Sequence, residues 1–161
     1  SADGAYCNFN NDIENSNIYG SLYNSYAVMD ERGICPEGWH VPNSTEFVEL
    51  EIFMGMDEEE AWTSGWRGTD EGGKMKSIGT LETGTGLWVT PNEGATNESG
   101  FNVLPAGYRY SSFGNFTSIN NLAYFWLSGG NALRSFSSGQ AGIYATTHNA
   151  RNGFSVRCLK D

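Results

Sequence analysis

The stretch GICPEGWHVPNSTEFVEL, residues 33–50, constrains the fold more than any other segment because it fixes a helix boundary. Pro42 ends any earlier helix. Asn43 can cap a new helix, and Glu46, three residues later, can reach back to the cap. An apolar stripe begins directly afterwards. Together these signals predict a helix over residues 44–54.

The composition of the whole chain favours a loop-rich, largely β fold over a helical bundle. Its 161 residues include 21 Gly and 22 aromatic residues, and only 17% of them are charged. A chain of this length is expected to form one domain, over residues 1–161, with a proper core. No run approaches the ~20 apolar residues of a membrane span, so membrane insertion is not expected.

Charge is distributed unevenly along the sequence. The net charge of −10 argues against nucleic acid as a partner. Eighteen of the nineteen acidic residues precede residue 99, and the last is Asp161. The run DEEE at residues 57–60 is interpreted as the solvated end of a helix. Residues 99–160 contain basic residues but no acid, so this last third is built differently from the rest.

Alternation and turn signals predict further elements. Residues 1–20 are polar and rich in Asn, and are expected to be an irregular lead-in. Gly20–Asp30 alternates well enough to be a strand, with Leu22, Tyr26 and Val28 pointing inward. The other expected elements are a second short helix ending near Gly65 and strands over residues 86–90, 101–104, 123–129 and 153–159.

Three cysteines leave several pairings open. A bridge between Cys35 and Cys158 would tie the end of the chain to its first third. Closing a loop of that length would contribute roughly 4–5 kcal/mol on the chain-entropy model, and would suit an exported protein. Cys7 is then either a buried free thiol or the true partner of one of the other two. No CxxC motif or Cys/His cluster indicates zinc.

Six segments occur in the order found in a known family, and together they span residues 5–161. They read YNSYAV, GICPEGWHVPNSTEF, GGKMKS, GATNESGFNVLPAGYR, AYFWLSG and NGFSVRCLKD. In these segments the chain resembles the Fibrobacter succinogenes major paralogous domain family. One departure is FWLSG, where the family usually has a Trp-Trp-Ser-Ser type of segment.

The resemblance implies an α+β protein with a C-type-lectin-like fold, related to formylglycine-generating enzymes and to retroelement-diversified variable domains. Such a fold has small twisted antiparallel sheets, two short helices and long ordered loops. It also implies a secreted or cell-surface bacterial domain. Trp39 and His40 would pack in the core beside the helix start, with His40 hydrogen-bonded rather than catalytic, and Cys35 would bridge to Cys158.

The resemblance carries no established enzymatic activity, and the residues point the same way. A formylglycine-generating enzyme needs a pair of reactive cysteines, whereas Cys35 and Cys158 are expected to be structural. His148 has no carboxylate near it in sequence. No Gly-rich phosphate loop lies between a strand and a helix. We therefore expect no enzyme, no catalytic residues and no cofactor.

Ligand binding remains, and residues 120–152 are its expected location. Their Tyr, Ser, Gly, Asn and Arg content is that of a paratope, in which rigid aromatics give contact area and small polar residues give adaptable hydrogen bonds. Trp126, Phe136 and Ile143 are expected to be core residues. The exposed candidates for ligand binding are Tyr124, Leu133, Arg134, Gln140, Tyr144, Thr146, Thr147, His148 and Asn149.

The ligand would be a protein or glycan on another cell, a phage or a host surface, bound by an adhesin or receptor-binding domain of a larger surface protein or pilus. Retroelement diversification randomises adenines in codons, and most residues of 120–152 are accessible from Asn codons. The alternatives are a dedicated carbohydrate-binding module and a structural subunit of a surface fibre. For residues 120–152, a set of solvated loops without a ligand is a further, less favoured interpretation.

One segment has the oxygen-rich composition of a calcium site. The run TPNEGATNESG holds an oxygen-rich set that could bind the ion. A turn whose side chains bond to their own backbone is the favoured interpretation. The calcium candidates are Asn92, Glu93, Asn97 and Glu98.

Overall fold

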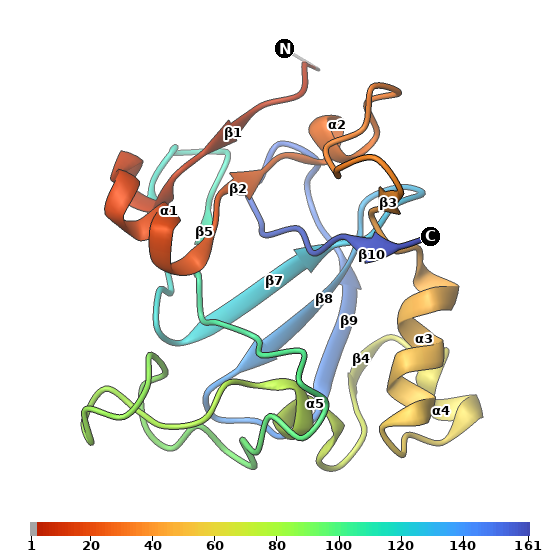
Figure 1. Ribbon diagram of the computed structural model, residues 1–161, viewed down its shortest axis with the longest axis vertical. Helices are drawn as coiled ribbons and strands as arrows, with labels where there is room; N and C mark the ends of the chain where they lie inside the picture. The colour runs from red at the N-terminus through yellow and green to blue at the C-terminus, as the bar shows by residue number, and fades with distance from the viewer. Residues whose placement is uncertain (1–2) are drawn as a thin grey trace.

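The computed structural model describes residues 3–161 and has an α+β architecture with several small antiparallel sheets (Figure 1). Its largest sheet has four strands in the order β4-β9-β8-β7, and every neighbouring pair is antiparallel. The strands are β4 (Gly65–Arg67), β7 (Leu122–Trp126), β8 (Ala132–Ser137) and β9 (Ile143–Thr147).

Helix α3 (Ser44–Phe53) begins where the sequence predicts. Asn43 Oδ1 accepts a hydrogen bond from Glu46 N at 3.0 Å, and Asn43 N donates to Glu46 Oε2 at 2.8 Å. The capping box is therefore complete. A second helix, α4 (Glu58–Ala61), follows, and the exposed acidic run forms its cap and first turn, as expected.

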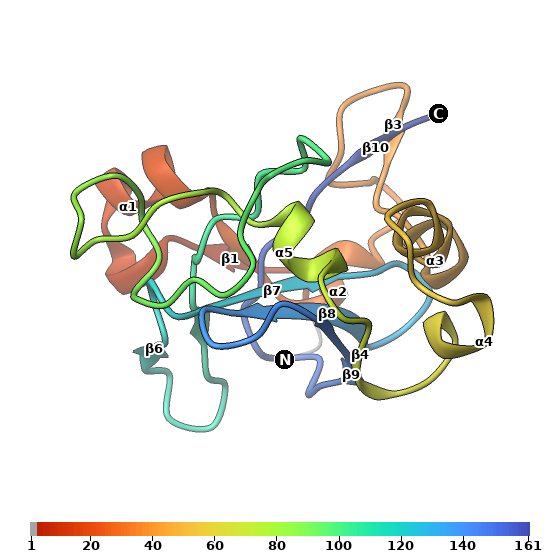
Figure 2. The same ribbon diagram turned by 90° about the horizontal axis from the view of Figure 1, so that it is seen from below.

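The two faces of the large sheet differ in what covers them. On one face, Phe125 and Phe136 join the largest apolar cluster together with Phe47 from α3 and Met75 from α5 (Glu71–Met75). Figure 2 shows both helices on this side of the sheet. The core assignments of Trp126, Phe136 and Ile143 are confirmed, because all three side chains are buried.

The first thirty residues contain more regular structure than expected. Residues 1–2 of the expected irregular lead-in lie outside the described part. The remainder contains regular structure, including a helix that Asp12 caps by accepting a hydrogen bond from Glu14 N at 3.0 Å. The elements here are β1 (Tyr6–Cys7), the 3-10 helix η1 (Phe9–Asn11), α1 (Ile13–Tyr19), β2 (Leu22–Tyr23) and α2 (Ser25–Val28).

The strand predicted over Gly20–Asp30 is wrong beyond Tyr23. The Asn24 side chain accepts a hydrogen bond from Ala27 N at 2.9 Å and so starts helix α2 instead. Leu22 and Val28, which are expected to point inward, are buried. Tyr26, which is expected to do the same, is half-buried.

Two other predicted strands, over residues 86–90 and 101–104, are wrong. Each contributes only one isolated bridge, through Trp88 and Val103, which are both 0% exposed. The apolar residues that suggested strands instead anchor loops in the core. At the end of the chain only Leu159–Lys160, strand β10, is a strand, although residues 153–155 also form isolated bridges. The remaining elements are β5 (Tyr108–Arg109) and β6 (Phe116–Thr117).

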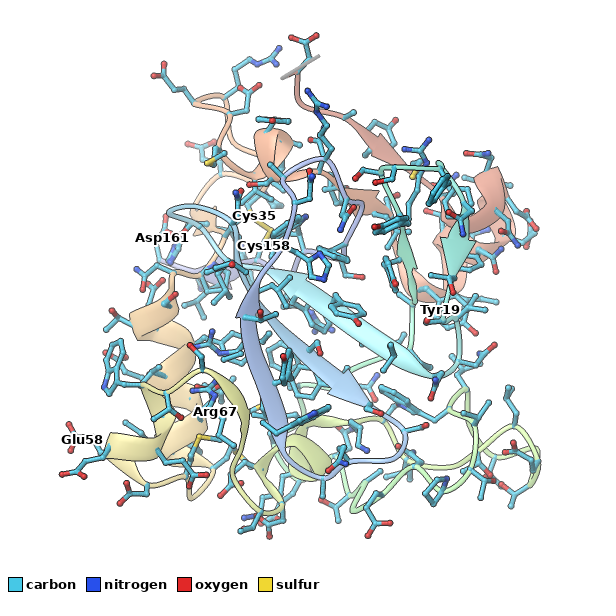
Figure 3. The ribbon with its side chains drawn as sticks, turned by 180° about the vertical axis from the view of Figure 1, so that it is seen from behind. Tyr19, Cys35, Glu58, Arg67, Cys158 and Asp161 are labelled. Carbon is cyan, nitrogen blue, oxygen red and sulfur yellow. A yellow bond between two sulfur atoms is a disulfide. The ribbon has the colours of Figure 1, made fainter. Side chains whose placement is uncertain are left out.

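The end of the chain returns to its first third. Strand β10 pairs antiparallel with β3 (Trp39–His40), and a disulfide joins Cys35 to Cys158 beside this pair (Figure 3). The implied bridge is therefore confirmed. Cys7 is a free, half-buried thiol, and this burial raises its pKa; of the two alternatives for Cys7, the structure therefore shows the free thiol.

Trp39 and His40 are not core residues, contrary to expectation. The β3–β10 pair lies at the surface, which leaves Trp39 44% exposed. His40 is only half-buried, but it is hydrogen-bonded as expected. Its Nδ1 lies 2.6 Å from Asp161 Oδ1 and its Nε2 lies 2.8 Å from Glu46 Oε1. His40 therefore links the end of the chain to the cap of α3.

We predict that His40 makes folding stability depend on pH. Both ring nitrogens can donate to the two carboxylates only when the ring is charged, and hydrogen bonding to Asp161 and then Glu46 raises the pKa of His40. Its stabilising contribution is therefore complete below the unfolded pKa of about 6.5 and is lost as pH rises through the higher folded value.

The test is to compare wild-type and His40→Gln melting temperatures at pH 5.5 and at pH 8.5. We expect the wild type to exceed the variant at pH 5.5, and the difference to shrink at pH 8.5. A difference that is the same at both pH values would contradict this account.

Candidate ligand-binding face

Four side chains, one from each strand, form a row across the large sheet, which we call the aromatic row. The register pairs Trp66 with Tyr144, Tyr144 with Ser135, and Ser135 with Tyr124. Cross-strand partners project to the same face, so all four lie side by side on one face. This face is opposite to α3 and α5, and Figure 3 looks onto it.

The β4 end of the aromatic row is open to solvent. Trp66 is 48% exposed, and its ring lies 5.2 Å from that of the half-buried Tyr144. An exposed pair of rings offers a flat apolar surface with polar edges, which is the kind of surface that proteins use for recognition.

The β7 end of the row is packed more closely. Tyr124 stacks on Phe154 at 4.8 Å and meets Tyr108 edge-on at 5.1 Å. Burial, followed by the neighbouring Tyr108 and Tyr144, raises the pKa of Tyr124 to about 12. Its hydroxyl is therefore neutral at physiological pH and can both donate and accept a hydrogen bond.

Leu133 is a correction to the predicted site. It projects to the same face as the aromatic row, but Trp126, Val28 and Phe154 cover it there, and it is 0% exposed. The packing of α2 and of residue 154 over this part of the sheet could not be deduced from the alternation within residues 120–152.

Arg134 is the second correction, because it is buried on the opposite face of the sheet. Its Nε donates to Glu51 Oε1 at 2.9 Å, and Arg67 Nη2 donates to the same oxygen at 2.5 Å. Burial raises the pKa of Glu51, and the two guanidinium groups oppose that shift. We call these three residues the buried triad.

The structure scatters the other predicted residues. Thr146 is half-buried on the face of the aromatic row, and Thr147 is exposed on the opposite face. Gln140 is exposed in the turn between β8 and β9, at the other end of β9 from His148 and Asn149. Only part of the predicted set is therefore brought together.

His148 and Asn149 lie in the loop after β9. His148 Nδ1 is hydrogen-bonded to Asn152 Nδ2 at 2.9 Å, and its ring lies edge-on to Tyr124 at 6.4 Å. Partial burial lowers the pKa of His148, so its ring is neutral at pH 7. Asn149 Oδ1 accepts from Arg151 N at 3.0 Å, which shapes the loop.

Trp66 is the residue that sequence reasoning missed. The sequence predicts the end of a short helix near Gly65, whereas the segment forms the edge strand β4. A Trp between Gly and Arg gave no periodic signal. Only the pairing with β9, almost 80 residues later, places Trp66 beside Tyr144.

Among the calcium candidates, all of them in the described part of the chain, only Asn97 has the local side-chain-to-backbone bond of the favoured interpretation. Asn92 is buried, and its Nδ2 donates to Ser77 O and Gly79 O, although its Oδ1 has no partner in the described structure. Asn97 Oδ1 accepts from Asn102 N at 2.8 Å. The other two candidates, Glu93 and Glu98, are exposed. Within residues 3–161, no cluster of three or more His, Cys, Asp or Glu side chains could hold a metal ion.

These observations define an α+β domain whose main sheet is buried on one face and presents an aromatic row on the other. A disulfide joins the last strand region of the chain to its first third. The sequence profile of the Fibrobacter succinogenes major domain matches residues 1–160. The chain belongs to the Fibrobacter succinogenes major domain family, as the resemblance implied. Comparison with curated proteins and with solved structures finds no significant match. No helix within residues 3–161 is long and apolar enough to cross a membrane.

Proposed function

We propose that this chain is a non-enzymatic, extracellular ligand-binding domain with a C-type-lectin-like fold, acting as an adhesin or receptor-binding domain. Its binding face is the aromatic row together with the exposed parts of residues 120–152. The observation that carries the proposal is the open Trp66–Tyr144 pair, which lies on the sheet face opposite to α3 and α5. Such rigid, amphipathic rings give contact area at low entropic cost.

Several features support the non-enzymatic and extracellular parts of the proposal. The Cys35–Cys158 disulfide suits an oxidising compartment and leaves no pair of free thiols for formylglycine-type chemistry. His148 is hydrogen-bonded to Asn152 rather than to an acid. Both arginines of the buried triad donate to Oε1 of Glu51, and this carboxylate is fully buried. None of these groups is poised as a nucleophile or a general base.

The partner is a protein or glycan on the surface of another cell, a phage or a host, and the domain would belong to a larger surface protein or pilus. A dedicated carbohydrate-binding module is the second candidate. One observation favours it: the exposed Trp66 ring beside Tyr144 has the flat form on which a sugar ring stacks.

The most specific version of the proposal is that a retroelement diversifies the codons of the binding face. It predicts that substitutions at adenines in the 3′ end of the gene fall on partly exposed positions such as Tyr144 and Thr146, and spare the buried Leu133 and Arg134. Deep sequencing of this gene across a population of the source organism measures the pattern. Equal invariance at all four codons would end this form of the proposal while leaving a dedicated ligand open.

Binding itself is tested with the double variant Trp66→Ala/Tyr144→Ala. Beads coated with the domain are added to a panel of bacterial and host cells, and bound beads are counted. We expect the double variant to lose at least about tenfold in affinity, as for an aromatic hot spot. Phe53→Ala, which removes an 83% exposed ring from α3, is the matched control and should bind normally. Equal binding by the double variant and the wild type would contradict the proposed face.

A further inference from the structure

A cleft of about 340 Å³ separates the large sheet from the start of α3 and the loop after α4. It lies on the face of the sheet opposite to the aromatic row, because Arg134 and Thr147 project there from β8 and β9. The residues that matter for its chemistry are Ser44, Trp62, Ser64, Arg134 and Thr147.

The wall of this cleft is built on the buried triad, which has an excess of one positive charge. Glu51 provides a single carboxylate for two arginines, Arg67 and Arg134, and the three side chains are 0%, 1% and 7% exposed. A further carboxylate, Glu60, lies near Arg67 but is exposed, so water screens its charge. A buried charge without a full complement of partners is costly, so this wall favours an anion.

Arg134 is the member of the triad that lines the cleft. Its Nε donates to Glu51, whereas its Nη1 makes only a long contact of 3.4 Å to Leu133 O. Its Nη2 has no hydrogen-bond partner within residues 3–161. The guanidinium group therefore retains donor capacity next to the cleft. A carboxylate is the anion that matches its planar fork, with two parallel hydrogen bonds.

The other residues of the cleft fit a sugar ring attached to that carboxylate. Trp62 is 57% exposed and offers a flat indole surface. The hydroxyls of Ser44, Ser64 and Thr147 can donate to and accept from sugar hydroxyls. The arginine is complementary to a carboxylate, the indole to the face of a sugar ring, and the hydroxyls at the rim to sugar hydroxyls. A carboxylate-bearing sugar combines all three features.

We propose that this cleft binds a carboxylate-bearing sugar, with Arg134 on the carboxylate and Trp62 against the ring. The inference rests on the proposed function, since it names the chemistry of one ligand of a binding domain. It places that ligand in a second location, separated by the sheet from the aromatic row.

The test is an NMR titration of the isotope-labelled domain with methyl β-D-glucuronide and with methyl β-D-glucoside, which differ only in the carboxylate. The expected result is shifts of the Trp62 indole N–H and of the Thr146 and Thr147 amides, with an affinity for the glucuronide about tenfold or more above that for the glucoside. Equal affinity for the two sugars, or no binding of either, would overturn the proposal. Sodium acetate binding as tightly as the glucuronide would also overturn it, because the sugar would then play no part.

Variants separate the cleft from the aromatic row. Trp62→Ala should weaken glucuronide binding about tenfold without unfolding the domain, while Trp39→Ala, which removes another half-exposed indole, should leave it unchanged. If Trp62→Ala has no effect, the cleft proposal fails. The bead assay with Trp66→Ala/Tyr144→Ala still decides the proposed function, because that variant leaves the cleft intact.

Discussion

Replacing Glu51 by alanine is expected to lower the free energy of unfolding by about 3–5 kcal/mol, the range for breaking a buried ion pair. Glu51 is fully buried in α3, and its Oε1 accepts from both Arg67 and Arg134. Without the carboxylate, two guanidinium groups would remain close together in the core with no anion between them. Urea denaturation followed by tryptophan fluorescence measures the change.

Glu49→Ala is the matched control, since Glu49 lies on the same helix but is exposed, and its effect should stay within about 0.5 kcal/mol. Glu51→Gln, which keeps the shape and removes the charge, should also be strongly destabilising. A loss below about 1 kcal/mol for Glu51→Ala would show that the triad does not depend on its charge balance.

The second large effect is expected from the double variant Cys35→Ser/Cys158→Ser, which should lose about 2–5 kcal/mol of stability. The two cysteines are 123 residues apart in sequence, so the disulfide restricts most of the unfolded chain. It also holds the short β3–β10 pair, which has only two residue pairs of its own. Thermal unfolding with and without a reducing agent measures the contribution.

Cys7→Ser is the control for this experiment, because Cys7 is unpaired and only partly buried. It should change stability far less than the double variant, and its melting temperature should fall when reducing agent is added, as for the wild type. If the double variant melts at the wild-type temperature, the disulfide does not stabilise the fold.

Local sequence signals predicted the parts of the fold that depend on neighbours in sequence. The cap and first turn of α3 follow from Asn43 and Glu46, whose two hydrogen bonds span three residues. Asp12 and Asn24 cap α1 and α2 in the same way, but the alternation of residues 20–30 predicts a strand where the Asn24 cap starts a helix. A single Asn therefore decided between helix and strand.

The candidate site depended on distant contacts and was predicted only in part. Arg134 occupies a sheet position that alternation cannot assign to core or surface, and its partner Glu51 is 83 residues away in sequence. Trp66 becomes part of the aromatic row only through the pairing of β4 with β9. Tyr124 and Tyr144 could be selected from composition, because residues of their type favour recognition wherever the sheet leaves them accessible.

The most direct test of the central claim is a saturation scan of residue 66 and of residues 120–152 in the displayed domain. The library is sorted once for folded display and once for binding to the cells identified in the bead assay. The account predicts that substitutions at Trp66 and Tyr144 keep display but lose binding, whereas those at Leu133 and Phe136 lose both. If substitutions at Trp66 and Tyr144 keep full binding, while binding is lost at displayed positions elsewhere, the aromatic row is not the ligand-binding face.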